Sequence, residues 1–174
     1  EEICFLLLYE RLPNKDELKQ FNQSLVQKRN VPENVYTFLK ALPADMNPMD
    51  VLQMSVPLLI QNDTTINEPG LEHSLYSAEN LIAGLSTITA AWARISEGKE
   101  PVAPDPGLSH AANFLYMLNN QAPDDESAHF FDTALVLHAE HSFNASTFTA
   151  RQVASTKAHI YAAISAAIGS LSGA

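Results

Sequence analysis

The stretch from Ser74 to Glu97 carries the longest helical pattern in this chain, and it constrains the fold more than any other segment. Its large apolar residues recur every three or four positions, at Leu81, Ile82, Leu85, Ile88, Trp92 and Ile95. Because an α-helix has 3.6 residues per turn, these side chains fall on one face. The middle of the segment is also rich in alanine, so we expect a long central helix that is mostly buried.

Shorter helical patterns lie on both sides of this segment. They predict helices over residues 2–11, 14–30, 32–42, 47–60 and 108–118, a helix from Asp124 or Asp125 to a pair of histidines, and one continuous helix from near Ser146 to about Leu171. The polar stretch 62–72 and the proline-containing stretch 98–107 predict longer connections. Strand-like alternation is hard to find and no internal repeat appears, so the sequence predicts one all-α unit.

Several residues mark where these helices begin or break. Asn14 and Glu17 have the spacing of a capping box. Pro48 follows Asn47 and suits the first position of a helix. Pro57 lies inside the predicted helix 47–60 and should kink or shorten it.

Composition excludes some classes of partner. The 174 residues carry a formal net charge of −10, which argues against a nucleic-acid partner, since phosphate binding needs clustered lysines and arginines. Only 17% of the residues are charged, which suggests that part of the surface is covered by further sequence or by a second subunit.

Cysteine usage and apolar run lengths bear on the compartment. The single cysteine, Cys4, cannot form an intramolecular disulfide and is expected to be a buried, inert thiol. No apolar run is long enough to span a bilayer and no signal peptide is visible, so we expect no membrane partner and a reducing, cytoplasmic setting. The start at Glu1 suggests an internal fragment of a longer chain.

The residues richest in chemistry lie near the end of the chain. His138 and His141 are three positions apart, which predicts that they share one helical face, and Asn144 and Ser146 follow in a predicted break between helices. These neutral donors and acceptors, with backbone N–H groups at the start of the next helix, suit a small dianion or a keto acid.

The two histidines allow two other interpretations. A pair of histidines on one helical face can share a metal ion, but the HExxH order of zinc proteases is missing and no distant carboxylate stands out, so the sequence predicts no metal site. A helix-end histidine without any function is the competing reading, and it applies more strongly to His138 than to His141. His110 is expected in the core, and His73, His129 and His159 on the surface.

The segment 138–151, HAEHSFNASTFTAR, resembles the signature HADHExNASTFxAR of the citrate synthase family. Weaker similarities occur in the family's order at residues 7–18 (LLYERLPNKDEL), 48–52 (PMDVL) and 104–118 (PDPGLSHAANFLYML). The resemblance therefore covers essentially the whole chain. Two departures from the pattern matter most: Ser142 stands where the family commonly has Glu, and Asn47 stands where His is frequent.

The resemblance implies an all-α, multi-helical citrate synthase-like large domain that is incomplete in residues 1–174, with the small domain and the C-terminal part absent. It implies an enzyme that condenses acetyl-CoA with oxaloacetate and water to give citrate and CoA. His141 and Asn144 would contact oxaloacetate. The catalytic residues, the CoA site and the substrate-binding arginines would follow Ala174, so no catalytic residue is expected within this chain and the chain alone should be inactive. No cofactor is implied, because acetyl-CoA is a substrate.

Two alternatives remain open at this stage. A 2-methylcitrate synthase, which uses propionyl-CoA, would show the same segment, and so would a helical binding module that has lost the enzyme activity. The resemblance also implies a homodimer or a higher homo-oligomer. We expect the apolar segments 47–60 and 74–97 to form the interface between subunits and to bury well over ~1,600 Å² there.

Overall fold

The computed structural model describes residues 1–66, 68 and 70–173, and none of these residues lies in a strand. The described chain forms nine α-helices and one 3₁₀ helix: α1 (Glu2–Tyr9), α2 (Lys15–Lys28), α3 (Glu33–Lys40), α4 (Pro48–Ser55), η1 (Val56–Asn62), α5 (Leu71–Ile95), α6 (His110–Asn119), α7 (Asp125–His138), α8 (Ala145–Ser155) and α9 (Ile160–Leu171). The all-α prediction is confirmed.

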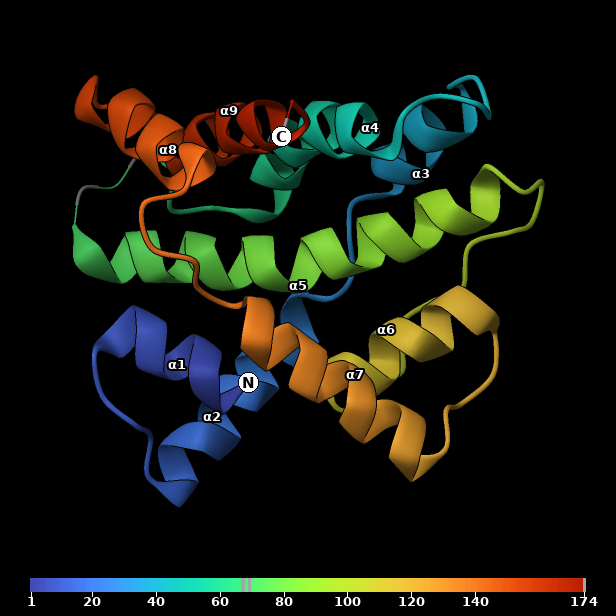
Figure 1. The fold of residues 1–174 in the computed structure, drawn as a ribbon, viewed down its shortest axis with the longest axis horizontal. Coiled ribbons are helices and arrows are strands. Elements are labelled where there is room, and N and C mark those ends of the chain that lie inside the picture. Colours follow the sequence, from blue (N-terminus) through green and yellow to red (C-terminus); the bar gives the residue numbers. More distant parts are fainter. Residues whose placement is uncertain (67, 69, 174) are drawn as a thin grey trace.

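The long helix α5 runs through the middle of the molecule, as Figure 1 shows. Helices α3, α4, α8 and α9 lie on one side of it, and α1, α2, α6 and α7 lie on the other. Between Leu75 and Ser96 no residue of α5 is exposed. The predicted central, mostly buried helix is therefore confirmed, although it begins three residues earlier than the apolar stripe indicated.

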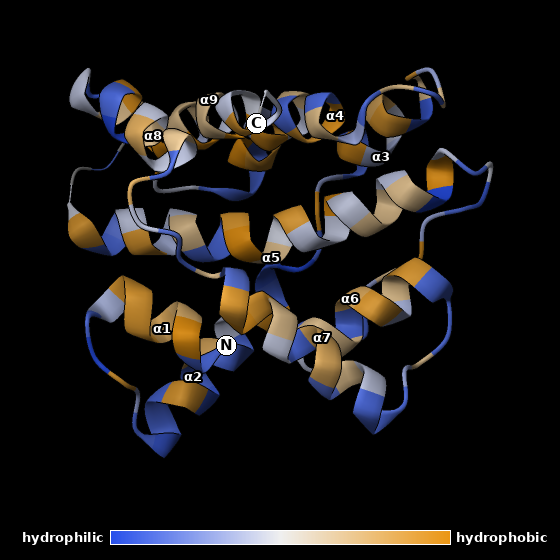
Figure 2. Cartoon of the chain, in the orientation of Figure 1, coloured by the Kyte–Doolittle hydropathy of each residue, from blue (hydrophilic) through white to orange (hydrophobic). Residues whose placement is uncertain are grey.

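Two apolar clusters hold the layers against α5. The larger joins α3, α4, η1, α5 and α9, and its most buried members are Val35, Leu39, Val51, Val56, Leu59, Ile88 and Tyr161. The smaller joins α1 and α2 to α5 and contains Phe5, Phe21, Leu25 and Ala83. Figure 2 shows hydrophobic residues mixed with hydrophilic ones along α2, α3, α4 and α5, whereas α1 is mostly hydrophobic. Burial of a large apolar side chain contributes about 1.5–3 kcal/mol, so these clusters dominate the stability of the fold.

The helix ends agree with the predictions from local sequence. The Asn14 side chain accepts from the backbone N–H groups of Asp16 and Glu17, and Glu17 accepts from the Asn14 N–H, which completes the capping box. Pro48 opens α4 with Asn47 as its cap. The α-helix ends at Ser55 and continues as η1 with Pro57 in its first turn, so Pro57 does shorten its helix.

The prediction of one continuous helix from Ser146 to Leu171 is wrong. The chain breaks between Ser155 and Ile160, where Lys157 adopts a left-handed backbone with φ of 66°. His159 then caps α9, because its Nδ1 accepts from the Ala162 N–H at 3.1 Å. His159 is exposed, as expected. The sequence contains many alanines on both sides of the break, so the pattern of apolar residues does not reveal where α8 ends and α9 begins.

Cys4 is half-buried in α1, and burial raises the pKa of its thiol above the ordinary value. None of the helices in the described part of the chain is both long enough and apolar enough to cross a membrane.

Candidate functional site

Of the two histidines of the predicted site, one ends a helix and the other lies in a loop. His138 is the last residue of α7, and its Nδ1 lies 2.7 Å from the Ala134 carbonyl oxygen one turn earlier. His141 lies beyond the helix, in the loop that leads to α8. The expectation that both share one helical face is therefore wrong, because α7 ends before His141.

Asn144 organises this loop. It is the N-cap of α8, and its Oδ1 accepts from the Thr147 N–H at 2.6 Å and from the Ser146 hydroxyl at 2.7 Å. Its Nδ2 donates to the His141 carbonyl oxygen at 2.5 Å. The Asn144 side chain therefore fixes the backbone of His141 relative to the start of α8. Both ends of the amide are already used within the loop, which sequence reasoning did not anticipate.

The loop leaves the His141 ring exposed. The imidazole makes no hydrogen bond with any of the described residues, whereas Ser142 donates to Glu140 at 3.1 Å. Phe143 takes a left-handed backbone with φ of 62°, and its side chain is fully exposed. The ring of His141 is thus held on a capped loop with its nitrogens available to a ligand.

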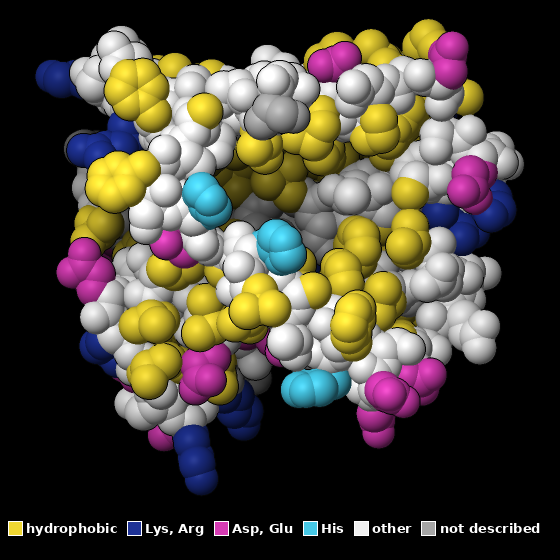
Figure 3. Space-filling view, in the orientation of Figure 1, with side chains coloured by type: hydrophobic (Ala, Val, Ile, Leu, Met, Phe, Trp, Pro, Cys, Tyr) yellow, Lys and Arg dark blue, Asp and Glu magenta, His cyan; other side chains and the backbone are white. Residues whose placement is uncertain are grey.

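The helices around this loop are only partly covered. Neither α7 nor α8 has a buried residue, and Phe130, Leu137 and Phe148 are each more than two-thirds exposed. Figure 3 shows a hollow between the upper and lower helices on this face, with histidine side chains at its rim and apolar side chains inside. An exposed apolar surface of this kind is typical of a contact or ligand-binding face.

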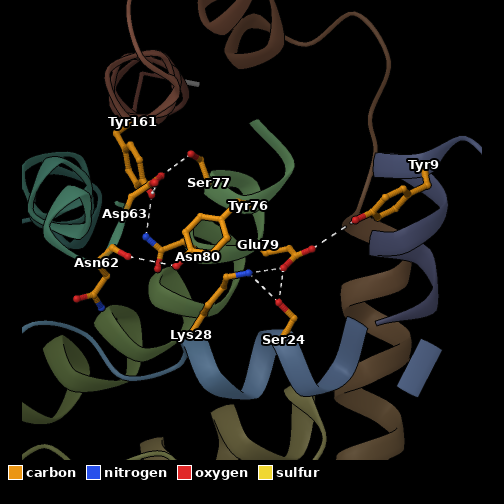
Figure 4. A network of polar contacts seen from close by, with 10 residues as sticks. All are labelled: Tyr9, Ser24, Lys28, Asn62, Asp63, Tyr76, Ser77, Glu79, Asn80 and Tyr161. Atoms are coloured by element: carbon orange, nitrogen blue, oxygen red, sulfur yellow. Dashed lines mark hydrogen bonds and ion pairs between the residues drawn. The ribbon is translucent and has the colours of Figure 1, made fainter. Parts of the chain in front are cut away.

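A buried polar network ties α9 to α5 (Figure 4). The Tyr161 hydroxyl donates to Asp63 at 2.8 Å and accepts from the Asn80 amide at 2.7 Å. Ser77 also donates to Asp63. Burial by itself raises the pKa of Asp63, but the hydrogen bonds from Ser77, Tyr161 and Thr65 outweigh it and hold that pKa below its usual range. The carboxylate is therefore charged and fully engaged.

A second network lies on the other side of α5 and joins it to α1 and α2. Glu79 pairs with Lys28, accepts from Ser24 at 2.5 Å and is approached by the Tyr9 hydroxyl at 3.5 Å. Lys28 also lies over the Tyr76 ring, 4.1 Å from its centre. Because every charged group here has a partner, the network positions helices and leaves no free group for chemistry.

Sequence reasoning missed both networks. A signal was available, because Ser77 and Asn80 are polar residues three positions apart on one face of a helix that the sequence predicts to be mostly buried, and Glu79 lies next to Asn80. Polar residues at helical spacing in a buried segment indicate partners on neighbouring helices. What the sequence does not show is which partners, since Asp63 and Tyr161 are far away along the chain.

The structure adds no metal-binding cluster to the site. Among the residues described, no group of three or more histidine, cysteine, aspartate or glutamate side chains is arranged to hold a metal ion. Two open cavities of about 810 and 800 Å³ lie on two faces of α2, and neither is lined by His141.

Comparison with known proteins decides the family. The family model described as "Citrate synthase, C-terminal domain" matches residues 1–174. The chain belongs to the citrate synthase family. The resemblance of the segment around His141 to the citrate synthase signature is thereby confirmed as a family relationship.

Individual citrate synthases agree in sequence and in fold. The chain is 40% identical over 173 residues to a citrate synthase of Deinococcus radiodurans, covering 99% of this chain and 46% of that protein. It is 37% identical to a 2-methylcitrate synthase of Mycobacterium tuberculosis, covering 99% and 44%. The solved citrate synthase of Pyrobaculum aerophilum matches with a TM-score of 0.90 at 35% identity, over 99% of this chain and 45% of that one. The chain thus spans about half the length of the citrate synthases that it matches.

Proposed function

We propose that the complete protein containing this chain is a citrate synthase, which condenses acetyl-CoA with oxaloacetate and water to give citrate and CoA. The observation that carries the proposal is the match of all 174 residues to the citrate synthase family, together with relatives of that name at about 40% identity. The proposal extends to the whole protein, because the chain spans about half the length of those relatives.

Within the chain, we propose His141 as an oxaloacetate ligand. Its ring is exposed and makes no hydrogen bond to the described residues, so a ring N–H is available to a carboxylate or keto oxygen. Asn144 is proposed to act on the same substrate. Its bond to the His141 carbonyl oxygen supports a positioning role, since it sets the place of the His141 backbone. A direct contact with oxaloacetate would require the amide to exchange one of its present partners.

The chemistry itself is proposed to use residues outside residues 1–174, so the isolated chain would bind substrate poorly and would not turn it over. This chain supplies the helical scaffold and the His141 loop. No cofactor is proposed, because acetyl-CoA is consumed as a substrate.

A second candidate is a 2-methylcitrate synthase, which takes propionyl-CoA in place of acetyl-CoA. The observation that favours it is the relative of that name at 37% identity over nearly the whole chain. The two substrates differ by one methylene group, whose burial is worth about 0.8 kcal/mol, so a small change in the acyl pocket decides between them. A non-catalytic helical binding module is the third candidate.

The experiment is an assay of CoA release by the complete protein with oxaloacetate and either acetyl-CoA or propionyl-CoA. The main proposal predicts a higher kcat/KM with acetyl-CoA. A preference for propionyl-CoA would support the second candidate. Absence of CoA release with both thioesters, from a protein that circular dichroism shows to be folded, would contradict an enzyme and leave the binding module.

We also propose that the protein associates as a homodimer or a higher homo-oligomer. Segments 47–60 and 74–97 are the expected interface between subunits. In this chain, residues 75–96 are buried or only partly exposed. A contact that buries well over ~1,600 Å² would keep the protein dimeric at low concentration. Sedimentation of the complete protein tests this, and a monodisperse monomer would contradict it.

A further inference from the structure

A second cavity of the molecule has the character of an anion site. It lies between α2 and the loop that enters α6, and its volume of about 800 Å³ is within the range of small-molecule pockets. Its polar lining includes Lys15, Lys19, Asn22 and Arg29 from α2 and its C-cap. None of these residues belongs to the His141 loop.

The guanidinium of Arg29 is the main feature of this cavity. Arg29 is only 2% exposed, and its Nη1 donates to the carbonyl oxygens of Asp105 and Leu108 at 2.9 Å each. Its Nε is buried and has no hydrogen-bond partner among the described residues. A buried donor that is left unpaired destabilises the protein, and more so when the group is charged.

Arg29 also lacks a counter-ion. Within the described part of the chain, no carboxylate lies within 4.0 Å of its nitrogens. Burial lowers the pKa of Arg29, and the more distant carboxylates of Glu1 and Asp105 only partly oppose that shift. A buried charge is normally paired, so the cavity beside Arg29 is where an anion would compensate it.

Other groups around the cavity would also favour a bound anion. Lys15 and Lys19 are exposed and carry no ion pair with a described residue, and both line the cavity. The Asn22 Oδ1 atom is buried without a partner, and rotation of this amide would present a donor instead. The first N–H of α6, at His110, already binds a carboxylate, that of Glu1, at 2.7 Å. Glu1 is the one acidic side chain in the lining, against three cations.

We propose that this cavity binds a phosphate group, either free or on a small metabolite, with the Nε of Arg29 as its buried donor and Lys15 and Lys19 at its mouth. A planar guanidinium binds phosphate oxygens with directed hydrogen bonds, and lysine adds charge without fixed geometry. The excess of cations in the lining fits a dianion better than a monoanion. The volume leaves room for an organic group beside the phosphate.

The test is calorimetric titration of the complete protein with inorganic phosphate and, separately, with glycerol phosphate, at an ionic strength held constant with sodium chloride. Saturable binding of either probe is expected, and the tighter of the two tells whether the free ion or a phosphate monoester is the better ligand. Absence of saturable heat with both probes would overturn the proposal.

Four variants locate the binding. Lys19→Gln should weaken it three- to tenfold, and Arg29→Lys, which keeps the charge but removes the Nε donor, should weaken it at least tenfold. Glu1→Gln should tighten it, because a like charge is removed. Lys40→Gln, an exposed lysine on α3 with the same change of charge, is the matched control and should leave it unchanged.

These variants also separate the cavity from the oxaloacetate site. Phosphate binding that survives His141→Ala and weakens in Lys19→Gln supports the cavity. Equal affinity in Lys19→Gln, Glu1→Gln and the unaltered protein would overturn the proposal even if Arg29→Lys fails to fold.

Discussion

The hydroxyl of Tyr161 lies 2.8 Å from the Asp63 carboxylate, although the two residues are 98 positions apart in the chain. Asp63 follows the end of η1, and Tyr161 is at the start of α9. The contact, together with the bond from Asn80 of α5 to the same hydroxyl, holds α9 against the centre of the molecule. Since α8 packs on α9, the placement of the His141 loop depends in part on this hydrogen bond.

Tyr161→Phe should therefore destabilise the protein. The change leaves the ring in place but removes a fully buried hydroxyl, so Asp63 loses a donor and Asn80 loses an acceptor. We expect a loss of about 1–3 kcal/mol in the free energy of unfolding, measured by urea denaturation. Tyr36→Phe is the control, because the Tyr36 hydroxyl makes no hydrogen bond to the residues described, and it should change stability by much less.

Gly84→Ala tests how closely η1 packs on α5. An added Cβ at Gly84 would lie 2.8 and 2.9 Å from the two Cδ atoms of Leu59, which is itself fully buried. The Leu59 side chain would have to shift within a filled core, at a cost of about 1–3 kcal/mol. Gly173→Ala meets nothing within 4 Å and serves as the control. A Gly84→Ala protein as stable as the unaltered one would show that Leu59 has room to move.

Asn144→Ala separates the cap of α8 from substrate binding. Loss of an N-cap side chain costs about 1 kcal/mol, so the variant should unfold at a lower urea concentration. It should also weaken oxaloacetate binding, because the His141 carbonyl oxygen loses the hydrogen bond from Asn144 Nδ2. Asn144→Asp keeps the cap acceptor but cannot donate to the His141 carbonyl. It should retain stability and still bind oxaloacetate less well, and full recovery of both properties would contradict a positioning role.

The capping box of α2 makes stability depend on pH through Glu17. The side-chain hydrogen bonds from Arg11, and then the Asn14 N–H, lower the pKa of Glu17 to about 2. The ordinary pKa of glutamate is about 4.3. Because the folded-state value is the lower one, the contribution is fully present above about pH 5 and disappears as the pH falls towards 2. Glu17→Gln should thus lower the Tm at pH 7, and the difference should shrink between pH 5 and pH 3. A constant difference over that range would contradict the assignment.

Much of the fold follows from local sequence. The stripe in 74–97 predicts α5, and Asn14, Pro48 and Pro57 mark helix ends correctly, because capping and proline geometry depend on only a few neighbouring residues. The sequence did not predict the break between α8 and α9. It depends on a left-handed Lys157 and on a histidine used as a cap, and neither has a strong sequence signal.

The candidate site was predicted only in outline. Residue types and the family signature single out His141 and Asn144, but the sequence does not reveal that α7 ends at His138 or that both ends of the Asn144 amide are engaged. The phosphate cavity had no sequence signal at all. It depends on the tertiary burial of Arg29 against carbonyl oxygens 76 and 79 positions away.

The most direct test of the account is the Michaelis constant for oxaloacetate in the complete protein carrying His141→Ala. Loss of a hydrogen bond to a charged ligand costs about 1.5–3 kcal/mol, so we predict a roughly ten- to hundredfold rise in that constant, or an equal fall in turnover, with an unchanged circular dichroism spectrum. His138→Ala, at the end of α7, should have a smaller effect. Kinetics of His141→Ala equal to those of the unaltered protein would contradict the assignment of His141 as an oxaloacetate ligand.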